Sequence, residues 1–558
     1  MDPDRARRGG ASARLKHRPT PSRRATHEAS ETRAREVPLV PEEVASRHSG
    51  DLGGKLTKLD PSRSISVLIE IDPDYVGLPC SQHTAWMLVN LMARAEKVVD
   101  NIFIQCPTDA AVCSKVIPFG SSRQLIERLI EAGRSIGVAA VNAHGGEEVD
   151  WVVTVGRRPT STANEHRVLC FGAGWWGGVN FDLELSDGAH WDSADISSPL
   201  PFGPYMAACF AAAHLFLTVR DARMIVGNEA THYGWDCWAQ RVAVEPTTGP
   251  ILPLELNLDG IGVAGVGAVG TAWMHTMWAV PGISGSVVLA DADEQGVTLT
   301  NLNRGVLFTA HDLKKPKAEV AADAAQCEVQ WRPTQERFQD SGFRPELLIS
   351  CVDTNRSREA LQDLYPARIL GGSTQDLRAE VLHAGPAGIG ACLRCYNKPE
   401  IQVSDEVLRA KALDPSTSTS LAHLAGELDL PLSEAIARLS EPACDMTSER
   451  LMRRLREVLD DSEVAPRFAV GFTSVAAGTL LAAETIIELL PAIKGRPLPR
   501  LDNSITVQFW RPASSVNGRS VLGRDSNCPK CAPRIVATRM WANRQSGFAW
   551  SLAKSGGQ

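Results

Sequence analysis

The chain has 558 residues, of which 44% are hydrophobic and 22% charged, and its formal net charge is −7. These values are typical of a soluble globular protein with about three or four domains, and the acidic balance gives no general argument for nucleic-acid binding. No apolar segment follows the basic N-terminus as a signal peptide requires, so the 13 cysteines are expected to be reduced thiols or metal ligands in the cytoplasm.

Residues 1–60 are expected to form a disordered basic tail. Met1 to Arg35 contains 10 Lys or Arg and 4 Asp or Glu, a net charge of +6, with few large apolar side chains. Such a segment buries too little apolar surface to offset the entropy that ordering would remove. A solvated tail, or translation from an upstream start codon, is the favoured interpretation, and a nucleic-acid or membrane tether is the alternative.

Strand-like and helix-like segments alternate from about Ser64 onward, which indicates an α/β fold. The expected elements are strand 64–71, helix 84–94, strand 101–105, helix 121–132, strands 149–155 and 167–171, and an Ala-rich helix 204–219. They form a first domain over residues 61–250.

The second half, residues 251–558, repeats this order of elements. A strand at 258–264 precedes a helix with the tetrad Thr271, Ala272, Trp273 and Met274, which matches Thr84 to Met87 in the first half. The later expected elements are strands 286–290, 347–352 and 368–372 and an apolar helix at 472–490. That helix is the most membrane-like stretch, but Glu484 and Glu488 within it favour a buried helix over a membrane span. The shared order predicts an internal duplication.

Only the second copy has a Gly-rich turn between its first strand and helix. Gly265, Gly267 and Gly270 form a GxGxxG pattern, and Asp291 ends the next strand 21 residues after Gly270. This pattern is typical of a nucleotide site in which backbone N–H groups meet phosphate and the carboxylate meets a ribose hydroxyl. The first copy has residues 78–83 there, with a proline and bulky side chains, and is predicted not to bind a nucleotide.

Residues downstream of the turn separate the possible reactions. Asn301, Arg304 and Lys317 follow Asp291, and Asp353 ends another apolar strand. A hydride-transfer site has no need for Arg, Lys and a carboxylate crowded around phosphates. An adenylating site needs them, because cations offset the charge on the triphosphate and a carboxylate holds Mg²⁺.

On these residues, from about Leu258 to Cys531, the chain resembles the ThiF/MoeB and ubiquitin-activating family. The resemblance implies a duplicated Rossmann-like adenylation fold with an active second copy. It also implies that Asp291 or Asp293 binds ribose, and that Asp353 binds Mg²⁺. The residues implied to contact the phosphates of ATP are Asn301, Arg304 and Lys317.

The chain departs from the family pattern at one point. Homodimers of the family carry an Arg-rich helix before the first strand, which reaches into the partner's site, and no such segment lies between Gln240 and Leu258. A fused, degenerate first copy is a possible source of the missing Arg. The expected assembly is a monomer with an internal pseudo-dimer, or a homodimer.

Two CxxC pairs predict a structural zinc site. The four thiols, which suit tetrahedral Zn²⁺ without an open position, are Cys392, Cys395, Cys528 and Cys531. The second pair lies 133 residues after the first, so the ion would tie the C-terminal segment to the main domain. Two unrelated CxxC turns, one of them redox-active, are the alternative.

A helical insertion at about 400–466 separates the pairs and contains Cys444. A thiol near a helix N-terminus is stabilised as thiolate, although Asp445 opposes this. In the resembling thioester-forming enzymes the nucleophile lies in this insertion, so Cys444 is a candidate acceptor of the activated carrier. A buried core cysteine is the alternative.

The predicted function is ATP-dependent adenylation of the C-terminal glycine of a small ubiquitin-like or sulfur-carrier protein. A downstream conjugating or sulfur-transfer protein is a further expected partner, and neither nucleic acid nor a membrane is expected. The alternatives are an NAD-dependent oxidoreductase and a zinc-stabilised scaffold that binds nucleotide without turnover.

Overall fold

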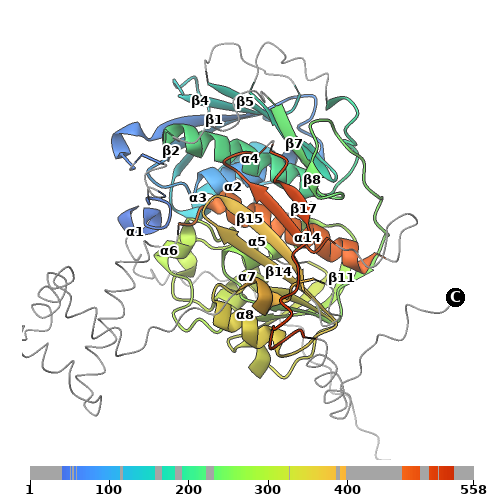
Figure 1. Ribbon diagram of the computed structural model, residues 1–558. Helices are drawn as coiled ribbons and strands as arrows, with labels where there is room; N and C mark the ends of the chain where they lie inside the picture. The colour runs from blue at the N-terminus through green and yellow to red at the C-terminus, as the bar shows by residue number, and fades with distance from the viewer. Residues whose placement is uncertain are drawn as a thin grey trace, which may run out of the picture. The chain divides into compact units, whose positions relative to one another are not determined.

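The computed structural model describes residues 41–532, except 51, 53–55, 58, 114–116, 158–165, 182–190, 222–231, 326, 385–389, 398–467, 491–501 and 513. The described residues belong to one compact unit. This unit contains two mixed sheets, each covered by helices (Figure 1).

The first sheet has the strand order β3-β2-β1-β4-β5-β6-β7-β8. The strands from β3 to β5 are parallel, and the remaining pairs are antiparallel. Its members are β1 (Ile65–Ile71), β2 (Val99–Gln105), β3 (Ala140–Ala143), β4 (Trp151–Val155), β5 (Arg167–Ala173), β6 (Trp176–Asn180), β7 (His232–Asp236) and β8 (Arg241–Val242).

The second sheet repeats that plan as β12-β11-β10-β13-β14-β15-β16-β17, again with five parallel strands followed by antiparallel ones. Its members are β10 (Ile261–Ala264), β11 (Ile283–Ala290), β12 (Val329–Thr334), β13 (Leu347–Ser350), β14 (Arg368–Gln375), β15 (Arg378–Ala384), β16 (Ser504–Gln508) and β17 (Gly518–Ser520). Strand β9 (Leu256–Asn257) pairs with β11 off this path. The same order and direction in both sheets support the predicted duplication.

Four helices form a central layer between the sheets: α2 (Pro79–Met92), α4 (Phe202–Val219), α5 (Ala268–Ala279) and α14 (Gly471–Leu489) (Figure 1). Helix α4 packs on β5 and β6, α14 packs on β14 and β15, and the two helices pack on each other. The other helices in the described residues are α1 (Pro41–Ala45), α3 (Leu125–Ile136), α6 (Leu299–Leu302), α7 (Lys317–Ala324), α8 (Asn355–Gln362) and α9 (Leu393–Tyr396). Short 3-10 turns cover Pro61–Arg63, Ala310–Asp312 and Phe338–Asp340.

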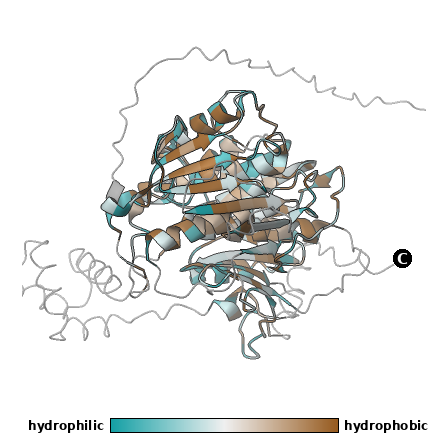
Figure 2. Ribbon diagram, turned by 90° about the horizontal axis from the view of Figure 1, so that it is seen from above, coloured by the Kyte–Doolittle hydropathy of each residue, from teal (hydrophilic) through white to brown (hydrophobic). Residues whose placement is uncertain are grey.

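The repeated tetrad places equivalent tryptophans in this central layer. Trp86 on α2 and Trp273 on α5 are both fully buried. The indole N–H of Trp86 donates to Nε2 of His275 on α5 at 2.9 Å, and that of Trp273 donates to Thr485 on α14 at 3.0 Å. A buried indole keeps its polar edge paired in this way, so the two halves share one core. Figure 2 shows hydrophobic residues along the strands and central helices.

Helices α4 and α14 are long and apolar enough to cross a membrane by length and composition. Within the fold, however, 83% and 89% of their most apolar 18-residue windows are buried. Their side chains face the two sheets and each other, as in the core of a globular protein. The prediction of a buried helix around Glu484 and Glu488 therefore agrees with the structure.

Two boundaries differ from the sequence expectations. The basic tail does not extend to residue 60, because α1 begins at Pro41 and both Val44 and His48 are buried. Helix α2 begins at Pro79 and not near Thr84, with proline at a first-turn position whose N–H needs no partner within the helix. The first copy therefore has a longer strand-to-helix connection, residues 72–78, where the second copy has only 265–267.

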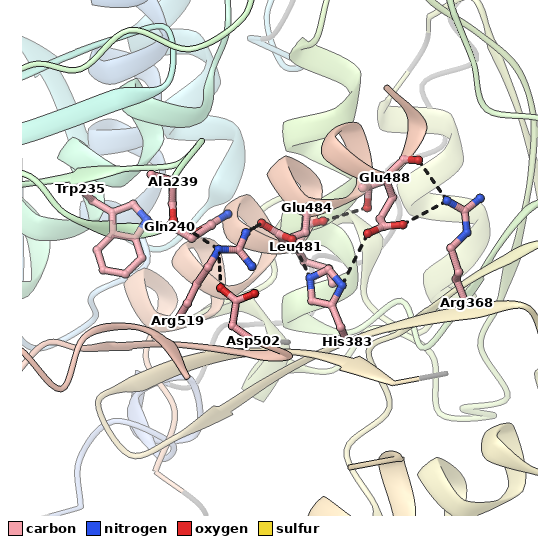
Figure 3. A network of polar contacts seen from close by, with 11 residues as sticks. Trp235, Ala239, Gln240, Arg368, His383, Leu481, Glu484, Glu488, Asp502 and Arg519 are labelled. Atoms are coloured by element: carbon pink, nitrogen blue, oxygen red, sulfur yellow. Dashed lines mark hydrogen bonds and ion pairs between the residues drawn. The ribbon is translucent and has the colours of Figure 1, made fainter. Parts of the chain in front are cut away.

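A polar network on α14 also joins the halves (Figure 3). Glu484 is fully buried, and its carboxylate contacts Nε2 of His383 on β15 at 2.6 Å and the guanidinium of Arg519 on β17. Nε–H of Arg519 donates in turn to the carbonyl of Ala239 in the N-terminal half at 3.3 Å. A buried carboxylate needs such partners, so this network fixes the end of α14 against both halves.

Candidate active site

The three glycines of the second copy have different surroundings. Gly265 has a φ of +89°, which disfavours other residues, and a Cβ there would lie 2.8 Å from the carbonyl oxygen of Cys351. A Cβ on Gly270 would lie 2.2 Å from the carbonyl oxygen of Gly265, so this glycine lets helix and strand pack closely. A Cβ on Gly267 would have no neighbour within 4 Å, because this residue borders a cavity.

A cavity of about 770 Å³ opens at the carboxyl ends of β10, β11 and β13. Every residue predicted for the nucleotide or Mg²⁺ lines it except Gly270, namely Gly265, Gly267, Asp291, Asp293, Asn301, Arg304, Lys317 and Asp353. Six cationic side chains border this space against four carboxylates, which favours an anionic ligand. The volume is within the range of small-molecule and cofactor sites.

The two acidic candidates for ribose have different environments. Asp291 accepts from the backbone N–H of Val266 at 2.7 Å and of Asp293 at 3.0 Å, so it fixes the Gly-rich turn against β11. Asp293 instead contacts the ammonium of Lys317 at the start of α7. Burial alone would raise the pKa of Asp293, but the hydrogen bond and charge of Lys317 outweigh it and lower that pKa. Asp293 thus orients Lys317, while Asp291 orients the turn.

Asn301 and Arg304 belong to a tight loop around α6. Asn301 closes a capping box with Thr298, so its side-chain oxygen is occupied by a backbone N–H at 3.0 Å. Arg304 donates to the carbonyl of Thr300 at 2.5 Å and to Oδ1 of Asn303 at 2.8 Å. Burial, and then the charge of Arg47, lower the pKa of Arg304 to about 10, and the charge of Asp353 opposes this. The guanidinium stays protonated and faces both charges.

Asp353 lies between β13 and α8 and also lines the cavity. Helix α8 starts directly after it, and its cap residue Thr354 accepts from the N–H of Ser357 at 3.1 Å. Two further cations of α8, Arg356 and Arg358, line the same cavity. The charge of Asp353 acts on Arg304, and a carboxylate is a suitable ligand for a divalent cation.

Arg47 also lines this cavity. It lies just after α1, in residues 46–50, which we call the N-terminal arm. Its carbonyl accepts from the N–H of Ala469 at 2.8 Å, which fixes the arm beside the start of α14. The sequence did not predict this residue, because residues 1–60 were expected to form a disordered tail. The signal was available: a short helix-forming run, Pro41–Ala45, precedes the first strand of the first copy.

The matching edge of the first sheet is filled by side chains. Phe171 and Trp191 stack with ring centroids 6.0 Å apart, and Tyr75 meets Phe171 edge-on at 5.7 Å. The guanidinium of Arg157 lies over Tyr75 and Phe171 and pairs with Asp192 at 3.1 Å. Arg157 lies just after β4, at the position where Val352 and Asp353 lie just after β13. The first copy therefore has a cation near the position at which the second copy has the carboxylate of Asp353. This arrangement agrees with the predicted loss of nucleotide binding.

The four CxxC cysteines meet, as predicted. Their sulfur atoms lie within 4.8 Å of one another, and three of the separations are 3.7, 3.7 and 3.3 Å. Sulfurs around tetrahedral zinc, at about 2.3 Å from the ion, are about 3.8 Å apart. The cluster also braces α8, because Lys530 pairs with Asp363 at 2.7 Å and with Glu359 at 3.3 Å. These residues fit a structural metal ion that supports the helix following Asp353.

Cys444 and the helical insertion at 400–466 lie outside the described residues. Among the described cysteines away from the metal cluster, Cys80, Cys170, Cys209 and Cys237 are buried. The others are partly or well exposed, namely Cys106, Cys113, Cys327 and Cys351. Four of these eight cysteines therefore belong to the core.

Comparison with known proteins places a family match on the second copy. The ThiF family model matches residues 255–513. The uncharacterized protein y4jF of Sinorhizobium fredii is 27% identical over 323 residues, covering 52% of this chain and 60% of that protein. The sulfur carrier protein ThiS adenylyltransferase of Escherichia coli is 27% identical over 164 residues, covering 26% of this chain and 64% of that protein.

Among solved structures, E. coli MccB with MccA-N7isoASN aligns with a TM-score of 0.30 and 15% identity, over 50% of this chain and 67% of that one. A second structure of E. coli MccB, with succinimide, aligns with a TM-score of 0.31 and 16% identity, over 49% and 66% of the two chains. Of the two sequence relatives, the chain covers 60% and 64% of their length, which is less than two thirds of each.

Proposed function

We propose that this chain, whose residues 255–513 form a ThiF family domain, is an adenylyltransferase that uses ATP to activate a carboxylate. The substrate class that we propose is the C-terminal glycine of a small ubiquitin-like or sulfur-carrier protein. The observation that carries the proposal is the cavity in which Arg304, Lys317 and Asp353 converge beside the Gly-rich turn. A nicotinamide site would not need this set of charges around the phosphates.

Each wall of the cavity has a proposed role. The turn at Gly265 and Gly267 approaches the phosphates through backbone N–H groups, and Asp291 binds the ribose from its fixed position on that turn. Asn301 completes the loop wall, where its capping contact holds α6 in place. Lys317, aimed by Asp293, and Arg304 neutralise the triphosphate. Asp353 would hold Mg²⁺, which supplies further positive charge to the phosphates when bound.

The reaction needs charge stabilisation more than proton transfer. A carboxylate oxygen of the substrate forms a bond to the α-phosphorus of ATP, and the bond from that phosphorus to the bridging oxygen breaks. Negative charge then develops on the departing pyrophosphate. Arg304, Lys317 and Arg47 lie around one cavity and can neutralise that charge without rearrangement.

Arg47 is the proposed source of the missing arginine. The N-terminal half thereby completes the site of the C-terminal half within one chain, as a partner subunit does in family homodimers. This supports a monomer with an internal pseudo-dimer over a homodimer. The four-cysteine cluster would hold Zn²⁺ as a structural ion, since all four ligands are thiols.

The test is exchange of labelled pyrophosphate into ATP, driven by a small protein ending in glycine encoded beside the gene. Arg304→Ala and Asp353→Asn should each lower the exchange rate by about a hundredfold or more, as loss of one contact to developing charge does. Arg344→Ala and Asp376→Asn are matched controls, because both residues are exposed and border no part of the cavity. Near-normal exchange by both cavity variants would refute the proposed site.

A further inference from the structure

The loop that carries Arg304 is held by the N-terminal half. Arg94, at the end of α2, is fully buried, and its guanidinium donates to the carbonyl oxygens of Leu302 at 2.8 Å, Val306 at 3.1 Å and Phe308 at 2.8 Å. Asn90, one turn earlier, accepts from Nε of Arg94 at 2.7 Å and donates to Val306 at 3.0 Å. The backbone of this loop is thus fixed, and the direction of Arg304 depends on its side-chain contacts.

A relay of hydrogen bonds sets that direction. Arg304 can only donate, so Oδ1 of Asn303 must accept at 2.8 Å, and the amide nitrogen of Asn303 must face Nδ1 of His48 at 3.1 Å. Nδ1 of His48 therefore accepts, and the ring proton lies on Nε2, which donates to the carbonyl of Glu96 at 2.9 Å. The second N–H of Asn303 reaches the carbonyl of Ala469 at 3.2 Å. Every partner in the relay has one consistent role.

We propose that His48 is a positioning residue, which orients the guanidinium of Arg304 through Asn303 and so raises the affinity of the C-terminal half for ATP. The inference rests on the proposed function, because it takes Arg304 as a phosphate contact. It goes further in assigning part of the ATP affinity to a residue of the N-terminal arm that does not line the cavity.

The surroundings of His48 keep it neutral, as the relay requires. Its ring is buried, and the charges that face it are cationic: the guanidinium of Arg220, which donates to the carbonyl of His48 at 2.6 Å, that of Arg304, and that of Arg94, which borders the same small internal space. Burial, and then the charges of Arg220 and Arg304, lower the pKa of His48 to about 4, and the hydrogen bond to Glu96 opposes this. A protonated ring would set Nδ1–H against the N–H of Asn303.

The test is a double-mutant cycle on the binding of Mg·ATP, measured by calorimetry on the full chain. His48→Leu should weaken binding by about tenfold, the factor typical of one lost hydrogen bond. Arg304→Ala should weaken it further, and adding His48→Leu to Arg304→Ala should change nothing more, because His48 acts through Arg304. His83→Leu is the matched control: this histidine is also buried but bonds the carbonyl of Pro199, so its loss should leave ATP affinity unchanged.

The outcomes separate the inference from the proposed function. Unchanged ATP affinity in Arg304→Ala would overturn both. A loss in Arg304→Ala with no loss in His48→Leu, or equal effects of His48→Leu in both backgrounds, would overturn only the relay. If His48→Leu does not fold, the tautomer in the unaltered protein decides, measured by NMR with ¹⁵N-labelled histidine at pH 7. Neutral His48 with its proton on Nε2 supports the relay, and a charged ring or a proton on Nδ1 refutes it.

Discussion

Replacing Arg47 by alanine should lower the rate of the adenylation reaction without lowering the stability of the fold. The arm is held by backbone contacts, since the carbonyl of Arg47 accepts from Ala469 at 2.8 Å and the guanidinium of Arg220 binds the carbonyls of the residues that follow. Alanine keeps all of these bonds. The guanidinium itself borders the cavity, where its charge lowers the pKa of Arg304, so in the empty site the two cations repel each other.

The magnitude follows from this geometry. Without ATP, removing Arg47 relieves that repulsion, so the free energy of unfolding should stay within about 0.5 kcal/mol of the original value or rise slightly. With ATP, the variant loses one cation at the developing pyrophosphate, which typically lowers the rate by about a hundredfold. Arg47→Lys should recover part of that rate, because it restores the charge but not the forked donor geometry.

The assay combines urea denaturation with pyrophosphate exchange. Arg63→Ala is the matched control, since Arg63 also lies ahead of the first strand but its guanidinium bonds Asp221 at the surface at 2.6 Å. The control should exchange normally. Exchange by Arg47→Ala within twofold of the unaltered protein would refute the role of Arg47. A loss of several kcal/mol of stability would show instead that the side chain holds the arm.

Three further predictions concern other parts of the chain. Metal analysis should find about one zinc per chain, and Cys392→Ser should lower the melting temperature and the zinc content together; a stable, metal-free protein would exclude the structural site. Cys444→Ala should keep pyrophosphate exchange but lose a thiol-sensitive carrier adduct on a non-reducing gel, and persistence of that band would assign the adduct to another thiol. Glu484→Gln should destabilise the fold by about 1.5–3 kcal/mol in urea denaturation, since a neutral amide replaces the buried carboxylate that contacts His383 and Arg519, whereas Glu488→Gln, which is partly exposed, should have a smaller effect.

The strands that the sequence predicted are those with long apolar runs. Strands β1, β4 and β13 lie inside a parallel sheet and are mostly buried, so their sequences are rich in Val, Ile and Leu and easy to recognise. The strands that pair only antiparallel were missed, and so were the parallel edge strands β3 and β12. Strand β6 contains two adjacent glycines, and a Cβ on Gly177 would lie 1.9 Å from the carbonyl oxygen of Gly203, so close packing and not β propensity determines this sequence.

Some residues of the candidate site were also predicted from the sequence, and others were not. Residues near one another in sequence with a known spacing, such as the glycines and Asp291, were found and line one cavity apart from Gly270. Arg47 and His48 were missed, because their contacts join positions more than 200 residues apart, and the helix-forming run Pro41–Ala45 marks the segment without showing what it contacts. His48 is only one residue from Arg47, yet its function depends on the amide of Asn303.

The two halves differ in the polar side chains that hold the loop carrying Arg304. When the two copies are aligned on the shared tetrad, Met277 corresponds to Asn90 and Pro281 to Arg94. The second copy therefore has neither of the polar side chains that bond the loop carrying Arg304. At this contact, therefore, the N-terminal half supports the C-terminal half, which has the cavity. In a symmetric dimer each subunit must keep both its own site and the residues that complete its partner's. In a fused pair, one half needs only the second set, and the contacts of Arg47, His48 and Arg94 are of that kind.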